Sequence, residues 1–164
     1  SSSAGPSTRF PHGEENRIKW WDAVDYIGVS AYYQLTDKND PTVAEIKAAW
    51  TDRGHLALLE NLSKRFNKPI IFTEIGYESK DGTNRMPASG RITGTLDLQE
   101  QADCYQAALE VMLEKPWFRG IFWFQWFAST RFPGSSPTGT GFMPWGKPAE
   151  EVLKRFYLSP EKPR

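Results

Sequence analysis

Three near-continuous apolar runs constrain the fold of this chain most strongly. They cover residues 26–33 (Tyr-Ile-Gly-Val-Ser-Ala-Tyr-Tyr), 69–74 (Pro-Ile-Ile-Phe-Thr-Glu) and 120–126 (Gly-Ile-Phe-Trp-Phe-Gln-Trp). A strand with one solvated face alternates apolar and polar side chains, whereas a strand buried on both faces does not. The three runs therefore predict strands that are covered on both faces, as in a parallel sheet flanked by helices.

A helical pattern follows each of these runs. Apolar residues at helical spacing predict one broken helix or two short ones between residues 43 and 66, with the break at Gly54. Asp97 and Glu100 predict the start of a further helix. In this pattern the aspartate side chain caps the first amides of the helix, and the glutamate side chain reaches back to the amide of the aspartate. Pro148 suits the first turn of a last helix. Strand, loop and helix repeated in this way predict an α/β chain of parallel βα units.

The lengths of the connections favour a barrel over an open sheet. The loops that follow the second and third strands are long and polar, whereas the returning turns at residues 67–69 and 115–117 are short. This asymmetry is typical of barrels with function on their C-terminal face. No glycine-rich phosphate-binding fingerprint follows a strand, which argues against a nucleotide-binding sheet.

The length of the chain limits how much of a barrel it can form. A whole (β/α)8 barrel takes about 250 residues, and this chain has 164. We therefore predict a partial, half TIM barrel of about three to four parallel βα units, with the remnant of a fourth strand near residues 7–10. Residues 1–13 are expected to be a flexible N-terminal segment and residues 14–164 the half-barrel domain.

A half barrel leaves the edges of its sheet open. Three or four parallel strands cannot close a barrel, and their outer strands present unpaired N–H and C=O groups. We therefore expect a homodimer or a higher homo-oligomer that forms through the open sheet edges, or a missing partner.

The composition excludes several other classes of partner. Lysine plus arginine number 20 and aspartate plus glutamate also 20, so no overall charge attracts nucleic acid or an anionic membrane. No apolar run is long enough to cross a bilayer, and we expect a soluble protein, cytoplasmic or secreted after loss of a signal. The single Cys104 cannot form an intramolecular disulfide and is interpreted as a buried apolar residue. Neither a metal nor a cofactor is expected.

Glu74 stands at the C-terminal end of the second apolar run. A carboxylate there is costly to bury unless it is paired or used. Period-two alternation places Glu74 on the face of Ile70 and Phe72, where it would point toward the barrel axis at the mouth. The alternative is a salt-bridged or solvated glutamate at a strand end. The seven tryptophans are similarly ambiguous, because indole rings fill cores and also stack on sugars.

Four blocks of the sequence resemble one enzyme family. Residues 68–77 (Lys-Pro-Ile-Ile-Phe-Thr-Glu-Ile-Gly-Tyr) resemble the nucleophile strand of clan A glycoside hydrolases, and the nearest family is family 113, the endo-β-1,4-mannanases. Residues 21–33, 120–126 and 146–150 resemble, in matching order and spacing, its sixth strand, its eighth strand and the start of its closing helix. The similarity extends over roughly residues 14–157.

This resemblance implies a retaining mechanism. One carboxylate attacks the anomeric carbon, while a second, about 5–5.5 Å away, protonates the leaving oxygen and later activates water. Glu74 matches the nucleophile. Tyr32, which alternation places on the inward face, is the candidate to hydrogen-bond that nucleophile, with Tyr33 as the alternative. Trp126 or Trp123 is the candidate aromatic floor beneath a bound carbohydrate.

The resemblance also implies that half of the machinery lies elsewhere. The family's acid/base is a glutamate preceded by asparagine at the end of the fourth strand, and these 164 residues contain no Asn-Glu pair. Glu78 and Asp81 are interpreted as solvated loop charges. Without the acid, catalysis should fall roughly a hundred- to ten-thousand-fold. Two hypotheses remain: a β-1,4-polysaccharide hydrolase that is active only when complemented, and a non-catalytic, self-associating half-barrel scaffold with residual carbohydrate binding.

Overall fold

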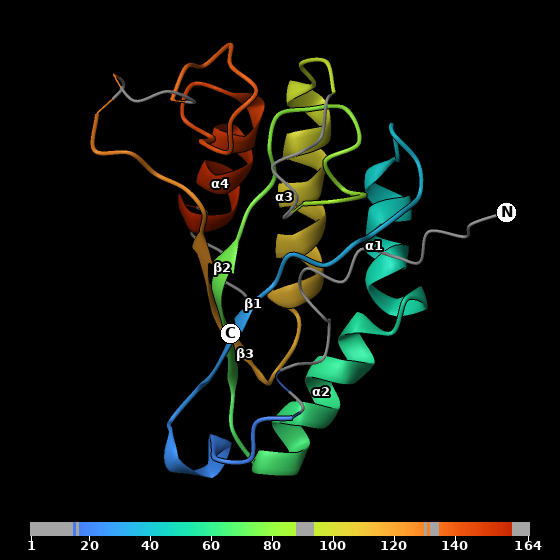
Figure 1. Cartoon of the computed structure of the whole chain (residues 1–164), viewed down its shortest axis with the longest axis vertical. Helices are drawn as coiled ribbons and strands as arrows, with labels where there is room; N and C mark the ends of the chain where they lie inside the picture. The colour runs from blue at the N-terminus through green and yellow to red at the C-terminus, as the bar shows by residue number, and fades with distance from the viewer. Residues whose placement is uncertain (1–14, 16, 88–93, 130, 132–134, 159–164) are drawn as a thin grey trace, which may run out of the picture.

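The chain alternates strands and helices (Figure 1). The computed structural model describes all residues except 1–14, 16, 88–93, 130, 132–134 and 159–164. A 3-10 helix (Trp21–Ala23) comes first, and the further elements are β1 (Ile27–Ser30), α1 (Val43–Asp52), α2 (His55–Phe66), β2 (Ile70–Ile75), α3 (Leu98–Met112), β3 (Phe118–Trp123) and α4 (Pro148–Leu158). The N-terminal segment predicted over residues 1–13, with its strand remnant, lies outside the described residues.

The three strands form one parallel sheet in the order β1-β2-β3, with β2 in the centre. This arrangement confirms the α/β class and the run of parallel βα units. The first strand is shorter than predicted and ends at Ser30 instead of residue 33, and the third begins at Phe118 and ends at Trp123 instead of residue 126. Both ladders stop there because the central strand ends at Ile75 and leaves no further partner groups.

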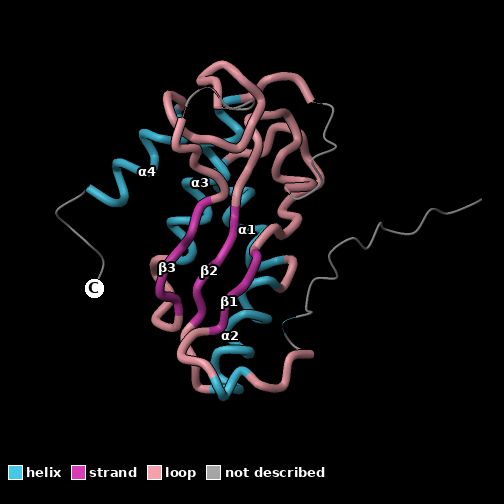
Figure 2. Tube along the Cα trace, turned by 60° about the vertical axis from the view of Figure 1, so that its left-hand side comes forward, coloured by secondary structure: helices cyan, strands magenta, loops and turns pink. Residues whose placement is uncertain are grey.

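The helices lie on one side of the sheet (Figure 2). In β1, Ile27 and Val29 are buried on that side, whereas Gly28 is partly accessible and Ser30 is exposed on the other. In β3, Phe122 exposes 64% of its surface. The strands were predicted to be covered on both faces, but within the described residues only one face is covered. We call the uncovered side the open face.

Aromatic side chains make the core between the sheet and α1. Trp50 of α1 is fully buried, and its ring stacks on Phe72 of β2 at a centroid distance of 6.1 Å. Tyr33 meets Trp50 edge-on at 5.6 Å, and Phe118 of β3 meets Phe72 at 4.8 Å. Such offset and edge-to-face pairs stabilise a core beyond the area they bury. Cys104 is buried in the same core, as expected, and burial raises the pKa of its thiol.

The helix boundaries follow local signals. Two helices occupy residues 43–66, and they are separated at Gly54, whose φ of 78° favours glycine. Asp97 caps α3 by accepting hydrogen bonds from the amides of Gln99 (3.0 Å) and Glu100 (2.8 Å). The last helix begins at Pro148, as predicted. No helix in the described part of the chain is long and apolar enough to span a membrane.

Candidate active site

The central strand β2 contains a bulge at Thr73 and Glu74. Its pairing with β1 steps from Val29↔Phe72 to Ser30↔Glu74, so β2 has one residue more than its neighbour over this interval. The ladder with β3 shifts in the same interval of β2. A bulge of this kind inserts one residue and re-aims the side chains beside it.

The bulge changes the face on which Glu74 lies. Ile70 and Phe72 are buried beneath the helices, so the prediction that Glu74 shares their face is wrong. Thr73 lies on the open face beside Gly28: a Cβ added to Gly28 would lie 2.8 Å from Cγ2 of Thr73, so the two positions face the same side of the sheet. Glu74 is half-buried, and its carboxylate turns toward Tyr32. Tyr32 follows β1 and, by alternation with Gly28 and Ser30, lies on the open face.

Tyr32 and Glu74 form a hydrogen-bonded pair at the C-terminal edge of the sheet. The Tyr32 hydroxyl donates a hydrogen bond to Oε1 of Glu74, and the backbone amide of Ala31 donates to the Glu74 carbonyl at 2.7 Å. Burial, and next the hydrogen bond to Glu74, raise the pKa of Tyr32 above its ordinary value, so the phenol stays protonated as a donor. Within the described residues the Glu74 carboxylate has no ion pair and no other hydrogen-bond donor. Its second oxygen is therefore available to a ligand.

Two of the predicted substrate-binding residues lie on the helix-covered side instead. Tyr33 is buried, its ring stacks on that of His55, and its hydroxyl donates to Oε1 of Glu15 at 3.1 Å. Trp123 stacks on Tyr105 of α3 at 4.1 Å. Alternation explains both placements, since each residue is one position away from a residue of the open face.

The indole of Trp123 also reaches the last helix. Its Nε1 donates to the Tyr157 hydroxyl of α4 at 3.2 Å. Trp126 differs, because it follows the end of β3 and leaves 50% of its surface exposed. Trp126 is therefore the aromatic residue of the predicted pair that offers a free ring surface.

The loop after β2 is more buried than the sequence suggested. Glu78 is only 8% exposed and pairs with Lys80 at 2.9 Å, so its interpretation as a solvated loop charge is wrong. Its second oxygen, Oε2, is buried without a hydrogen-bond partner. The Lys80 ammonium offsets the charge of Glu78, which explains how the carboxylate tolerates this burial.

Glu100 links this loop to α3 instead of completing a capping box. Its carboxylate accepts hydrogen bonds from the amides of Gly82 (2.6 Å) and Asn84 (3.0 Å) and from the Asn84 side chain (2.6 Å). The Asn84 side chain in turn accepts from the amide of Thr36 at 2.9 Å. This buried network joins the loops after β1 and β2, and burial raises the pKa of Glu100. Single residues such as Asn84 carry no sequence signal of such a role.

An acidic cluster lies beside this network. Carboxylate oxygens of Asp81, Asp97 and Glu100 lie within 4.8 Å of one another. Asp97 already accepts from the first amides of α3, and Glu100 from the loop amides. The cluster is accounted for by loop and helix anchoring.

Comparison with known families decides the lineage of this site. The sequence model of Glycoside Hydrolase Family 113 matches residues 7–147. The chain belongs to glycoside hydrolase family 113. None of the curated proteins compared with this family 113 chain matches it.

Solved structures agree with this assignment. The GH113 β-mannanase of Alicyclobacillus acidocaldarius, in complex with ManMIm, is 32% identical with a TM-score of 0.68, and the match covers 88% of this chain and 42% of that one. A GH113 β-1,4-mannanase solved as a complex is 28% identical with a TM-score of 0.68, over 91% of this chain and 43% of that one. The family 113 chain thus spans less than half the length of these structures, and a partial barrel is confirmed.

Proposed function

We propose that this chain carries the nucleophile half of a retaining β-mannan-hydrolysing site. The hydrogen bond from Tyr32 to Glu74 carries the proposal, because it fixes one oxygen of a carboxylate at the C-terminal edge of the sheet and leaves the other free. Glu74 attacks the anomeric carbon, the glycosidic C–O bond breaks, and the leaving oxygen takes a proton from an acid. Water then hydrolyses the glycosyl ester and restores Glu74.

The proposed substrate is a β-1,4-linked mannan. Two structures at 32% and 30% identity are described as a β-mannanase and a β-1,4-mannanase. Trp126 supports a carbohydrate ligand, because its exposed indole offers an apolar face on which a sugar ring stacks.

The acid/base group is proposed to come from a second polypeptide segment. The family resemblance places that glutamate on the fourth strand of the barrel, whereas the matched strands here correspond to its later part. Glu78, the buried acid on the following loop, is already paired with Lys80. Mannan hydrolysis is therefore proposed to require the earlier βα units, on whichever polypeptide they lie.

Mannan hydrolysis with and without such a partner tests this proposal. We expect little reducing-sugar release from β-1,4-mannan by the chain alone, and an increase of roughly a hundred-fold or more when the first five βα units of a family 113 mannanase are added. An aryl mannoside with an acidic leaving group, such as 2,4-dinitrophenol, needs no protonation, so the chain alone should release a first equivalent of the phenol rapidly. Further turnover should be slower, because the missing acid/base also activates water in the second step. Failure of both the complemented reaction and the activated substrate would contradict the proposal.

The scaffold hypothesis rests on a different observation. Phe122 exposes most of its side chain on the open face, and β1 and β3 are each paired on one side only among the residues that the structure describes. A parallel sheet is normally covered on both faces. If the chain forms a defined oligomer and does not turn over the activated mannoside, the non-catalytic interpretation replaces the enzymatic one.

We predict that the isolated chain forms a dimer or a larger assembly in solution. Covering Phe122 and the open sheet edges removes apolar surface and unpaired backbone groups from water. Light scattering at micromolar concentration measures the assembly mass, and Phe122→Lys should shift it toward the monomer. A folded, strictly monomeric wild-type chain would rule out self-association.

Replacing Tyr32 by phenylalanine should slow the first step at Glu74 without unfolding the protein. The change removes the hydroxyl that orients the carboxylate, and one hydrogen bond to a charged group is worth about 1.5–3 kcal/mol, or roughly ten- to a hundred-fold in rate. Release of dinitrophenol from the activated mannoside measures the step. Tyr33→Phe is the matched control, because its hydroxyl contacts Glu15 on the other side of the sheet. Equal rates for the two variants would contradict this role of Tyr32.

A further inference from the structure

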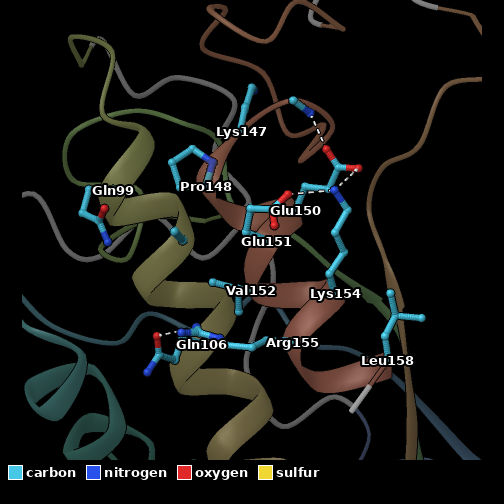
Figure 3. A pocket seen from close by; sticks show the side chains of 12 residues that line it. Gln99, Gln106, Lys147, Pro148, Glu150, Glu151, Val152, Lys154, Arg155 and Leu158 are labelled. Atoms are coloured by element: carbon cyan, nitrogen blue, oxygen red, sulfur yellow. Dashed lines mark hydrogen bonds and ion pairs between the residues drawn. The ribbon is translucent and has the colours of Figure 1, made fainter. Parts of the chain in front are cut away.

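Lys147 is a buried lysine at the start of α4 that the proposed chemistry does not use. Only 2% of its surface is exposed. Its Nζ donates to Oγ of Ser79 at 2.8 Å and to the carbonyl of Gly141 at 2.9 Å. Figure 3 shows it at the upper end of the groove between α3 and α4, apart from the Glu150–Lys154 ion pair.

No acid neutralises this ammonium within the described residues. The charged groups on the surrounding described elements are Asp97 at the N-cap of α3; Glu100, Asp103 and Glu110 on α3; Glu150, Glu151, Lys154 and Arg155 on α4; and Glu78, Lys80, Asp81 and Arg85 on the loop after β2. Each of these acids has another partner: helix or loop amides for Asp97 and Glu100, Lys154 for Glu150 and Glu151, Lys80 for Glu78, Lys47 for Glu110, and the side-chain amides of Asn39 and Gln99 for Asp81 and Asp103. Burial without a counter-charge lowers the pKa of Lys147 to about 8.

The two groups that Lys147 holds belong to different loops. Ser79 follows β2, and Gly141 lies on the long loop after β3. Ser79 itself bonds that second loop, through its hydroxyl to the carbonyls of Gly139 (2.8 Å) and Gly141 (3.0 Å). Gln101 of α3 completes the junction by donating to the carbonyls of Tyr77 (2.8 Å) and Phe142 (3.1 Å). Lys147 is the charged member of this junction.

The junction reaches the wall of the candidate active site. Phe142, next to Gly141, packs edge-on against Phe124 at a centroid distance of 5.2 Å. The amide of Phe124 donates to the carbonyl of Ile75, the residue after Glu74, at 2.8 Å. Phe124 also lies two residues before Trp126. Movement of the loop after β3 would therefore displace the aromatic segment beside the carboxylate.

We propose that Lys147 is a positioning residue: it clamps the loop after β3 onto the loop after β2 and so holds the segment of Phe124 and Trp126 beside Glu74. The catalytic part of this inference rests on the proposed function, whereas the clamp itself does not. A buried ammonium without a counter-ion reduces stability. The contact between the two loops should therefore open more readily while Lys147 is charged.

Hydrogen exchange of the two loops tests the clamp without any substrate. In Lys147→Met, which keeps the length of the side chain and removes its donors, the amides of Ser79 and of residues 139–142 should exchange at least about tenfold faster, while those of α2 remain unchanged. Lys154→Met, at an exposed position of α4, should leave the loops unchanged. The proposal would be overturned if the loop amides exchanged at the same rate in Lys147→Met and in the wild type. It would also be overturned if the substitution accelerated exchange by the same factor in the loops and in α2.

The pH dependence of wild-type exchange tests the clamp even if Lys147→Met does not fold. The closed clamp lowers the Lys147 pKa to about 8 from the ordinary 10.5, so the open form binds more protons between these values and rising pH favours the closed form. After correction for intrinsic exchange, loop opening should fall roughly tenfold from pH 7 to pH 9. A flat profile would overturn the proposal.

Turnover of the activated mannoside separates this inference from the proposed function. If wild-type chain turns the substrate over, Lys147→Met should be at least about fivefold slower and should lose the response to pH between 7 and 9, while Lys154→Met matches the wild type. If wild-type chain shows no turnover, the proposed function fails, and the exchange measurements still decide the clamp.

Discussion

Replacing Glu74 by glutamine is expected to abolish turnover of the activated mannoside. Glutamine has nearly the same shape and can still accept the hydrogen bond from Tyr32, so the fold should be kept, but its amide does not attack the anomeric carbon. The covalent route is then closed, and we expect a loss of at least about 10³-fold, equivalent to about 4 kcal/mol of barrier. Dinitrophenol release measures the rate.

The control for this substitution is Glu78→Gln. Glu78 is the nearest acid along the chain after Glu74, and it is buried against Lys80 on the following loop. Its replacement should leave the rate within about threefold of the wild type. If activity survived Glu74→Gln and disappeared in Glu78→Gln, the nucleophile would be Glu78, and the assignment of Glu74 would be wrong.

Replacing Gly76 by alanine is expected to destabilise the whole sheet. A Cβ at this position would lie 2.0 Å from the carbonyl oxygen of Phe124 and 3.0 Å from its carbonyl carbon. These are backbone atoms that the hydrogen bond from Phe124 to Ile75 holds in place, so they cannot move aside cheaply. We expect a loss of about 3 kcal/mol or more in the free energy of unfolding.

Gly120→Ala is the matched control, because a Cβ there meets no atom within 4 Å. Its effect should stay within about 1 kcal/mol. Guanidinium unfolding followed by circular dichroism measures both variants under identical conditions. A Gly76→Ala chain as stable as Gly120→Ala would show that the loop after β2 and the end of β3 do not approach as closely as described.

The element types of this fold were predictable because their signals are local. The apolar runs predicted the three strands, and Gly54, Asp97 and Pro148 marked helix boundaries. The strand ends were less predictable, because the ladders of β1 and β3 stop where β2 stops. The sequence also did not predict that helices cover only one face of the sheet, because an apolar run does not indicate which element of the chain, or which other chain, will cover it.

The orientation of Glu74 shows the limit of reasoning from alternation. Period two assumes an unbroken ladder, and the extra residue at Thr73 exists only in relation to β1 and β3. The same limit applies to Glu100, whose spacing from Asp97 is that of a capping box although its carboxylate binds the loop at Gly82. The Lys147 clamp joins groups 68 residues apart, which no local pattern reports.

Identification of the glycosylated residue tests the central claim most directly. A 2-deoxy-2-fluoro-β-mannoside with a dinitrophenol leaving group forms the glycosyl ester without an acid and then hydrolyses slowly, because the fluorine destabilises the cationic transition state. Mass spectrometry of the intact chain and of its peptides locates the adduct. We predict one fluoromannosyl group, on Glu74. An adduct on any other residue, or an unmodified chain after prolonged exposure, would contradict the assignment of Glu74 as the nucleophile.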